Sequence, residues 1–321
     1  MFNFTKKTPL NILSIGTRIL LKDVMDQYLR SLGEIKTYYA SKLSVAVESY
    51  KQHSVQIIFC EEFFPEGSAL DFIESIGGLN VCADRYFVLA TENQSDELVS
   101  LAMEKNIDEI LVKPFATEDI TKIIERYSEK KETLKRDWCI DLNSAIIANE
   151  QKRFQEAATL FSGLLSKYPD NMPLLIEAAG FFYGQNRVEE AGRVVEKVLA
   201  VNPSNAKALH LQGLCFKRTG KFKEALESFY QSNQVSPMNS HRYGDIVDTL
   251  LQMADERSAY ALKVDSENSA LILARLKIMV IRREYRQAVQ YMETRRALLP
   301  ELERKEADIY LAVSKKMAGI K

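Results

Sequence analysis

The chain has 321 residues, which is enough for about two or three domains. Apolar residues make up 46% of it and charged residues 27%, so the composition is globular and excludes a disordered chain. The net charge of −1 gives no argument for binding nucleic acid or an anionic membrane. Residues 1–128 hold 13 basic and 19 acidic residues, whereas the remainder holds 30 and 25. The two parts therefore carry opposite net charge, which favours their mutual attraction or differently charged partners.

The cysteines give no sign of a disulfide framework or a metal site. Cys60, Cys82, Cys139 and Cys215 are irregularly spaced and form no Cys-x-x-Cys pair. We interpret them as free, mostly buried thiols in a reducing compartment. The apolar run near the start is interrupted by Arg18 and is too short to span a membrane. We therefore predict a cytoplasmic protein without membrane insertion.

The first 127 residues alternate between strand and helix patterns. Short apolar runs predict strands at 10–15, 35–40, 55–60, 85–91 and 109–114. Helical spacing predicts helices at 18–32, 41–53, 68–76, 96–106 and 117–127, with Ser41 and Thr117 as N-caps. Five such units predict an α/β domain with a doubly wound, parallel (βα)5 sheet. The functional crevice of such a sheet lies at the carboxyl ends of its strands, which here carry Gly16, Glu61, Thr91 and Lys113.

From residue 117 onward the pattern is entirely helical. The charged stretch 128–137 has no core-forming periodicity, so it is a linker or a solvated helix extension. The helix is favoured because the stretch contains no Gly or Pro. We place one domain at 1–127 and a second, all-α domain at 138–321.

The second domain contains an internal repeat. Ala157, Ala191 and Ala225 are 34 residues apart, and so are Pro169, Pro203 and Pro237; Ala288 and Pro300 repeat the same Ala-to-Pro distance of 12. This pattern resembles the tetratricopeptide repeat (TPR) family. The resemblance implies a TPR α-solenoid of stacked helix pairs with a concave, partner-binding groove. We expect a shortened repeat at 240–268 and a terminal capping helix at 301–316.

Three segments of the first domain resemble the receiver domain of bacterial response regulators: IIFCEEFFPEG, FVLAT with Thr91, and ILVKPF with Lys113 and Pro114. The resemblance places Glu61 at the phosphoacceptor position. It also places Gly16 and Thr17 where an acidic pair would help to hold Mg²⁺. Glu92 takes the place of the small residue after the switch threonine Thr91, and Ile110 takes the aromatic switch position.

These departures predict a degenerate receiver that takes no phosphoryl group. Mg²⁺ needs hard oxygen ligands, and only one of the three usual carboxylates is present. Glu61 also extends its carboxylate by one methylene, and about 1 Å of displacement can cost ~100-fold in rate. We expect a contact between Glu61 and Lys113 instead, and a cis peptide bond at Lys113–Pro114.

The repeat resemblance also assigns residues to the groove. The first repeat contributes Leu142, Ile146, Asn149 and Glu150; the second contributes Ile176 and Tyr183; the third contributes Lys207, His210, Leu214, Lys217 and Arg218. We expect Tyr183 and the leucines to act as apolar anchors. Lys207, Lys217 and Arg218 are expected to steer an acidic segment of the partner.

These patterns favour a non-enzymatic signalling adaptor or scaffold. The degenerate receiver domain docks on a signalling partner or associates with itself, which leaves a homodimer through this domain open, and the groove binds a client protein. We find no catalytic residue, cofactor site, metal site or nucleic-acid motif. Two alternatives remain: a phosphorylation-responsive response regulator with a divergent acceptor site, and a regulatory subunit of an enzyme supplied in trans.

Overall fold

The computed structural model describes residues 10–16, 35–64, 67–239, 241–253, 269–299 and 301–320. The chain divides into two compact units, Met1–Leu174 and Leu175–Lys321. The helix predicted at 18–32, the site residue Thr17 and most of the predicted shortened repeat lie outside the described residues. Within the described ranges, no helix is both long and apolar enough to cross a bilayer.

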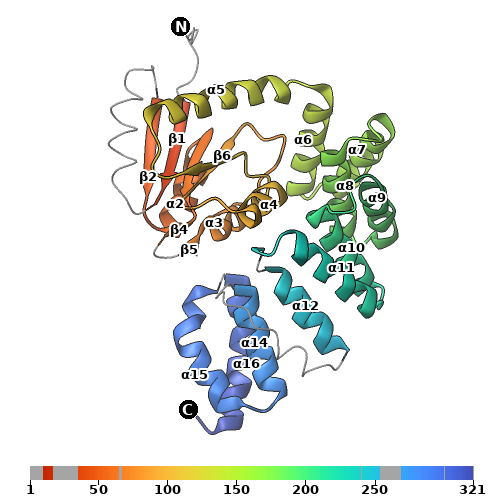
Figure 1. Ribbon diagram of the computed structural model, residues 1–321. Coiled ribbons are helices and arrows are strands. Elements are labelled where there is room, and N and C mark those ends of the chain that lie inside the picture. Colours follow the sequence, from red (N-terminus) through yellow and green to blue (C-terminus); the bar gives the residue numbers. More distant parts are fainter. Residues whose placement is uncertain are drawn as a thin grey trace. The chain divides into compact units, whose positions relative to one another are not determined.

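The first unit is built on a five-stranded parallel sheet (Figure 1). Its strands are β1 (Leu10–Ile15), β2 (Ile35–Ala40), β3 (Ile57–Glu61), β6 (Tyr86–Thr91) and β7 (Glu109–Val112). Their spatial order is β2-β1-β3-β6-β7, so the predicted doubly wound (βα)5 fold is confirmed. A hairpin of two-residue strands, β4 (Phe63–Phe64) and β5 (Gly67–Ser68), was not predicted because it is too short to show alternation.

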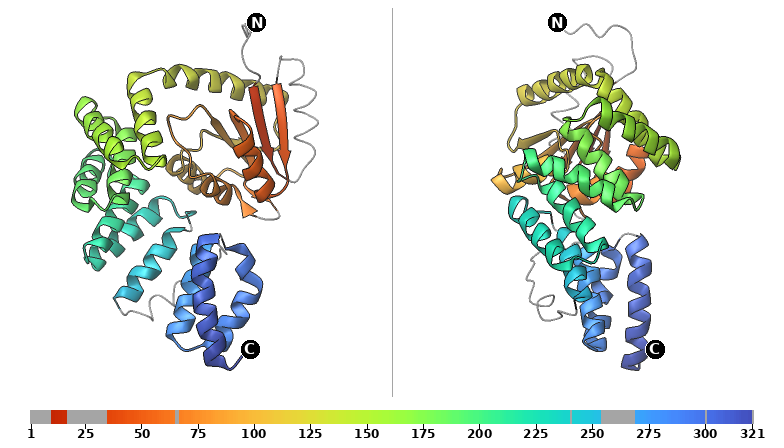
Figure 2. Two further views of the ribbon diagram at one scale, coloured as in Figure 1. Left: turned by 180° about the vertical axis from the view of Figure 1, so that it is seen from behind. Right: turned by 90° about the vertical axis from the view of Figure 1, so that its right-hand side faces the viewer.

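Helices cover both faces of this sheet (Figures 1 and 2). On one face, α5 (Thr117–Leu134) packs Ile120, Ile123 and Tyr127 against the strands. On the other, Phe72 of α3 (Ala69–Ser75) stacks on Phe87 of β6, with ring centroids 6.3 Å apart. The helices α2 (Leu43–Gln52) and α4 (Asp96–Glu104) complete the described part of the unit's α/β layers. This two-sided burial explains why the strands are apolar throughout.

The helix starts differ from the expected caps. The N-cap of α2 is Lys42 and that of α5 is Ala116, so both predicted caps, Ser41 and Thr117, were wrong. The start of α5 is instead satisfied by a side chain from within the helix: the Ala116 N–H donates to Asp119 Oδ2 at 2.8 Å. A carboxylate three residues into the helix thus accepts a hydrogen bond from a backbone N–H group at the helix start.

The charged stretch that follows the α/β part is helical up to Leu134, as the sequence favoured. Tyr127 donates a hydrogen bond to Asp84 at 2.7 Å, and Lys130 lies 2.6 Å from Asp108. These contacts hold the middle of α5 against the loops that flank β6 and β7.

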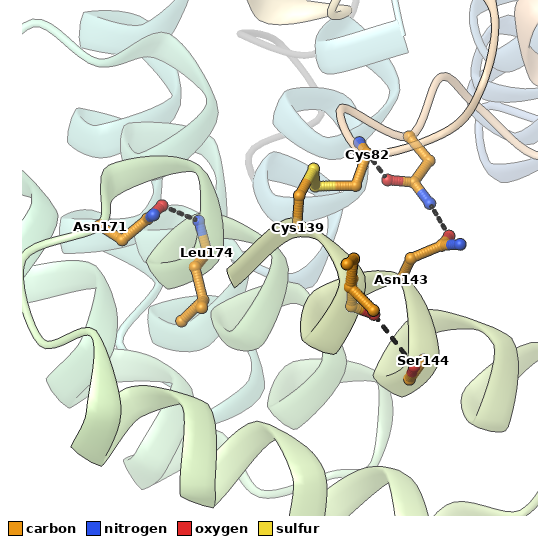
Figure 3. Close-up of a disulfide and its surroundings, with 8 residues drawn as sticks. Cys82, Cys139, Asn143, Ser144, Asn171 and Leu174 are labelled. Atoms are coloured by element: carbon orange, nitrogen blue, oxygen red, sulfur yellow. Dashed lines mark hydrogen bonds between the residues drawn. A yellow bond between two sulfur atoms is a disulfide. The ribbon is translucent and has the colours of Figure 1, made fainter. Parts of the chain in front are cut away.

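A disulfide joins Cys82, in the loop before β6, to Cys139, in the first turns of α6 (Asp137–Glu150) (Figure 3). This overturns our interpretation of four free thiols; Cys60 and Cys215 are free and buried, as predicted. Beside the disulfide, Asn80 donates a hydrogen bond to Asn143 at 3.2 Å. The two cysteines are 57 residues apart, so only the folded approach of α6 to this loop reveals the pair.

The remaining helices follow the predicted repeat. They are α7 (Phe154–Lys167), α8 (Met172–Gly184), α9 (Val188–Val201), α10 (Ala206–Arg218), α11 (Phe222–Val235), α12 (His241–Gln252), α14 (Ser269–Ile281), α15 (Tyr285–Arg295) and α16 (Glu301–Ala318), with a short 3-10 turn η1 (Arg296–Leu298). Each repeat alanine is buried, so the close crossing of paired helices that small residues allow is present. The predicted terminal capping helix is α16.

The turns inside the helix pairs share one backbone conformation. Lys152, Asn186, Gly220 and Arg283 all have positive φ, between 60° and 76°. Each lies five residues before a repeat alanine. The next residue's N–H then reaches back to a carbonyl of the preceding helix at 2.8–2.9 Å. This left-handed helix ending recurs in every one of these four pairs, including the last, which the sequence matched least well.

In the second unit, two hydrophobic clusters join neighbouring helices, and α14 contributes to both. Phe229 of α11 packs with Ile246 of α12 and Ile278 of α14, and Leu276 of α14 packs with Met292 of α15. Arg242 is fully buried at the start of α12, and it donates to the carbonyls of Ser232 and Ser236 at 3.0 and 2.8 Å. Its guanidinium thus satisfies the last carbonyls of α11, where a cation also complements the helix dipole.

We predict that reducing the Cys82–Cys139 disulfide lowers the free energy of unfolding by about 2–4 kcal/mol, because the bond restricts the unfolded chain. Denaturant unfolding with and without a phosphine reductant measures this. The matched control is the Cys82→Ser/Cys139→Ser double variant, on which the reductant should have no effect. Equal stability of the oxidised and reduced wild type would contradict the prediction.

We predict that Gly213→Ala destabilises the second unit by about 1–3 kcal/mol, because a Cβ there would lie 2.5 Å from ring carbons of Phe229. Gly192→Ala is the matched control: Gly192 is also helical, but a Cβ added there would meet no atom within 4 Å. There the substitution should be neutral or stabilising by up to about 1 kcal/mol. Thermal melts of both variants decide the matter.

Candidate functional site

Four of the predicted pocket residues lie at the carboxyl ends of neighbouring strands. Gly16 follows β1, Glu61 ends β3, Thr91 ends β6 and Lys113 follows β7. Backbone hydrogen bonds keep these ends in register: the Lys113 N–H donates to Thr91 O at 2.8 Å, and the Gly16 N–H donates to Ala40 O at 3.0 Å. Because all the strands are parallel, the sheet brings these residues to one edge, as the sequence predicted.

At this edge Glu61 and Lys113 form an ion pair. Lys113 Nζ lies 2.6 Å from Glu61 Oε1, and the two side chains are 22% exposed for the lysine and 11% for the glutamate. The expected contact is therefore confirmed. A charge-assisted hydrogen bond of this length is among the strong ones, and its partial burial reduces screening by water.

The side chain of Glu61 also fills the space above Gly16. A Cβ added at Gly16 would lie 2.6 Å from both Cγ and Cδ of Glu61. Any larger residue at Gly16 therefore requires Glu61 to move. The long side chain of Glu61 and the absence of a side chain at Gly16 therefore depend on each other for packing.

Thr91 interacts with a residue that the sequence analysis did not single out. Its hydroxyl donates to Glu62 Oε2 at 2.6 Å and accepts from the Asn93 N–H at 3.3 Å. Glu92, which takes the place of the small residue after Thr91, is exposed, and its effect on a phosphoryl group remains a prediction. The tandem Glu61–Glu62 was the available signal, since consecutive residues leaving a strand point to different sides.

Two further pocket positions lie in β7 or shortly after it. The Lys113–Pro114 peptide bond is cis, as predicted. Ile110 is half-buried within β7, and its assignment to the switch position remains a prediction. Among the residues that the structure describes, no group of three or more His, Cys, Asp or Glu side chains could hold a metal ion.

The groove residues of the first repeat lie in the first unit. Ile146 and Asn149 are half-buried and Glu150 is exposed, so these three remain candidates. Leu142 is 0% exposed, which corrects its assignment: it is a core residue of α6 and cannot contact a partner. The repeat template gives the helix face, but it does not show which residues of that face the fold of this chain buries.

In the second unit, α8 and α10 bring several predicted groove residues together. The guanidinium of Arg218 lies 4.4 Å from the ring centroid of Tyr183, and it donates to Asn186 Oδ1 at 3.2 Å. Arg218 is exposed, whereas Ile176, Tyr183 and Leu214 are half-buried. Burial raises the pKa of Tyr183, and the charge of Arg218 opposes that shift. This stacked pair forms an amphipathic surface at the C-terminal ends of the two helices.

The other predicted basic residues of this face are already paired. Lys207 Nζ lies 2.8 Å from Glu177, and His210 Nε2 lies 2.9 Å from Asp245. Lys217 Nζ lies 3.3 Å from Asp245. The expectation that these cations steer an acidic partner therefore needs correction, because acids of the chain itself neutralise Lys207 and Lys217.

The two pairs at Asp245 belong to a longer row of paired polar and charged side chains, which we name the charge ladder: His210, Asp245, Lys217, Asp248, Lys277 and Glu306. Lys277 closes it, at 3.5 Å from Asp248 and 3.0 Å from Glu306. Burial alone would raise the pKa of Asp245, but His210 and Lys217 hold it below its ordinary value. Burial would lower the pKa of Lys277, whereas Asp248 and Glu306 raise it. The ladder connects α10, α12, α14 and α16.

Comparison with known proteins finds one family model and several solved structures that are similar to parts of this chain. Residues 148–215 match the family model of the tetratricopeptide repeat. A CheY-like response regulator receiver domain protein from Methanospirillum hungatei is 16% identical, with a TM-score of 0.35 over 39% of this chain and 99% of that one. PilF of Pseudomonas aeruginosa is 16% identical, with a TM-score of 0.44 over 67% of this chain and 97% of that one. A thermophilic TPR protein of Thermus thermophilus is 14% identical, with a TM-score of 0.45 over 55% of this chain and 98% of that one. No curated protein matches.

The sheet order, the strand-end residues and the matched repeat segment together describe the chain. It joins a receiver-like α/β domain to a region of tetratricopeptide repeats, the type of repeat that mediates protein–protein interaction.

Proposed function

We propose that the protein is a non-enzymatic signalling adaptor. Its receiver-like domain takes no phosphoryl group and docks on a signalling partner, while its repeats hold a client protein. The observation that carries the proposal is the Glu61–Lys113 ion pair folded over Gly16. We further propose that it acts in the cytoplasm and needs no cofactor. In that compartment the Cys82–Cys139 disulfide has to resist reduction by cellular thiols.

The ion pair supports loss of phosphotransfer for an electrostatic reason. A phosphoryl group brings about two negative charges, which need a nearby cation. Here a carboxylate already neutralises Lys113 at 2.6 Å. A phosphoryl group on Glu61 would remove that carboxylate charge and force the side chain away from Gly16. Gly16 also offers no side-chain oxygen for Mg²⁺, which takes near-octahedral sets of oxygens.

The repeats support the client-binding half of the proposal. Arg218 stacked on Tyr183 gives an exposed cation above an aromatic ring, the residue types that dominate binding energy in protein interfaces. The lysines of the neighbouring charge ladder, Lys217 and Lys277, are already paired with acids of the chain itself. We therefore propose a client segment that offers an apolar group for Tyr183 and one acceptor for Arg218, rather than a strongly acidic segment.

We predict that the full chain gains no phosphoryl mass when incubated with acetyl phosphate and Mg²⁺, because Glu61 is committed to Lys113. Intact-mass spectrometry is the measurement, with an active receiver domain as the positive control. A gain of one phosphoryl group that disappears in Glu61→Ala would overturn the adaptor proposal in favour of a phosphorylation-responsive regulator.

The packing of Glu61 on Gly16 sharpens this test. Gly16→Asp alone should destabilise the first unit, whereas Gly16→Asp with Glu61→Asp should recover part of the loss, because the shorter side chain vacates the space. The coupling between the two sites should be on the order of 1 kcal/mol or more. Adding Asp at Thr17 as well should improve Mg²⁺ binding, which isothermal calorimetry can follow.

We predict that Tyr183→Ala and Arg218→Ala each weaken client binding by about 1–3 kcal/mol, because they remove the two halves of the stacked pair. The client is first captured from the native cell, and the affinity of purified variants is then measured. Arg193→Ala is the matched control, since it removes an exposed arginine from α9. If both groove variants bind normally while changes at the receiver-like domain abolish binding, the repeats do not hold the client.

A further inference from the structure

The last helix of the second unit carries a row of exposed apolar side chains. Ile309, Val313, Met317 and Ile320 are 65%, 44%, 59% and 40% exposed. Their steps of four, four and three residues place them on one side of α16, or directly after its end. We name these four residues the α16 stripe.

The opposite side of α16 is occupied by the protein itself. Ala307 and Ser314 are fully buried, and Ala307 packs into the core formed with α14 and α15. The helix is therefore apolar on two sides. A helix on the surface of a soluble protein normally presents a polar face opposite its core side.

Isolated exposed apolar residues occur elsewhere in this unit without forming a row. Val201, Tyr230, Ile281 and Leu298 belong to four different elements. Scattered residues of this kind are ordinary on protein surfaces, whereas a helix-periodic row is a feature of packing interfaces. The α16 stripe stands apart because three of its members lie on one helix and the fourth, Ile320, lies directly after it.

The charges beside the stripe indicate what covers it. Residues 301–310 contain four acidic and two basic residues, and residues 311–321 contain three lysines and no acid. Two α16 helices side by side in parallel would place like charges together. In an antiparallel pair, the Glu306 and Asp308 end of each helix lies beside the Lys315 and Lys316 end of the other, which is attractive.

The acidic groups can take part without leaving their present partners. Glu306 lies 3.0 Å from Lys277, and Asp308 pairs with Arg296 at 2.6 Å. Their side chains are 44% and 41% exposed, so each carboxylate can accept a further bond.

We propose that a second copy of this chain covers the α16 stripe, with the two α16 helices antiparallel about a twofold axis. Each copy then contributes the same patch, and Val313 lies close to the axis. This contact is distinct from the receiver-domain homodimer that the sequence left open. A single helix pair is smaller than the roughly 1,200–2,000 Å² of standard interfaces, so the dimer is concentration-dependent.

The first test measures the mass of the full chain by sedimentation across a wide concentration range. We expect a monomer–dimer equilibrium, and Ile309→Glu/Val313→Glu should raise the dimer dissociation constant on the order of tenfold or more, because it buries charge. Val201→Glu is the matched control: Val201 is 69% exposed on α9, and its substitution should leave the equilibrium unchanged. Circular dichroism confirms that each variant is folded.

The second test addresses the antiparallel arrangement. Lys315→Glu/Lys316→Glu and Glu306→Lys/Asp308→Lys should each weaken self-association, and mixing the two variants should restore dimers containing one copy of each. A wild type that stays monomeric at every concentration overturns the proposal. So does a dimer that both α16 variants leave intact while Val112→Glu, on β7 of the receiver-like domain, disrupts it.

Discussion

A carboxylate at the end of a buried strand needs a compensating cation, and Lys113 supplies it for Glu61. This requirement explains the other features of the pocket. Glu61 reaches Lys113 through the space that a side chain at Gly16 would occupy. Glycine, which has no side chain, therefore fits at this position after β1. Thr91, which is not engaged by Glu61, pairs with Glu62 instead. Two adjacent carboxylates thus pair with different strand-end residues, Glu61 with Lys113 and Glu62 with Thr91.

Periodicity predicted most of the fold because the fold depends on it. Continuous apolar runs specify strands buried on both faces, and the 34-residue spacing of alanines specifies paired helices. The strand-end positions of Glu61 and Lys113 then follow from parallel topology alone. The disulfide could not be predicted, since Cys82 and Cys139 meet only through the docking of α6. The N-cap of α5 was missed because Asp119 satisfies the start of that helix from inside it rather than from the capping position.

The repeat surface contains side-chain pairs that a family template does not predict. The template identified the helix face that carries Lys207 and Lys217, but their partners are acids 30 and 28 residues away in sequence, on neighbouring helices. Such pairs depend on how successive helices stack, which no local pattern records. The charge ladder also changes what this face can recognise. A ligand that needs the lysines has to displace the chain's own acids, whereas one that uses Arg218 and Tyr183 meets a cation and a ring already aligned.

The left-handed turns have a consequence for how the repeats come apart. An L-residue in this conformation costs about 1–2 kcal/mol unless it is glycine or, to a smaller degree, asparagine. The turns at Gly220 and Asn186 are therefore relaxed, whereas those at Lys152 and Arg283 are strained. The strained turns belong to the first and last of these four helix pairs, and the relaxed turns lie between them. Local opening is thus favoured at the strained turns of Lys152 and Arg283 over the relaxed turns of Gly220 and Asn186.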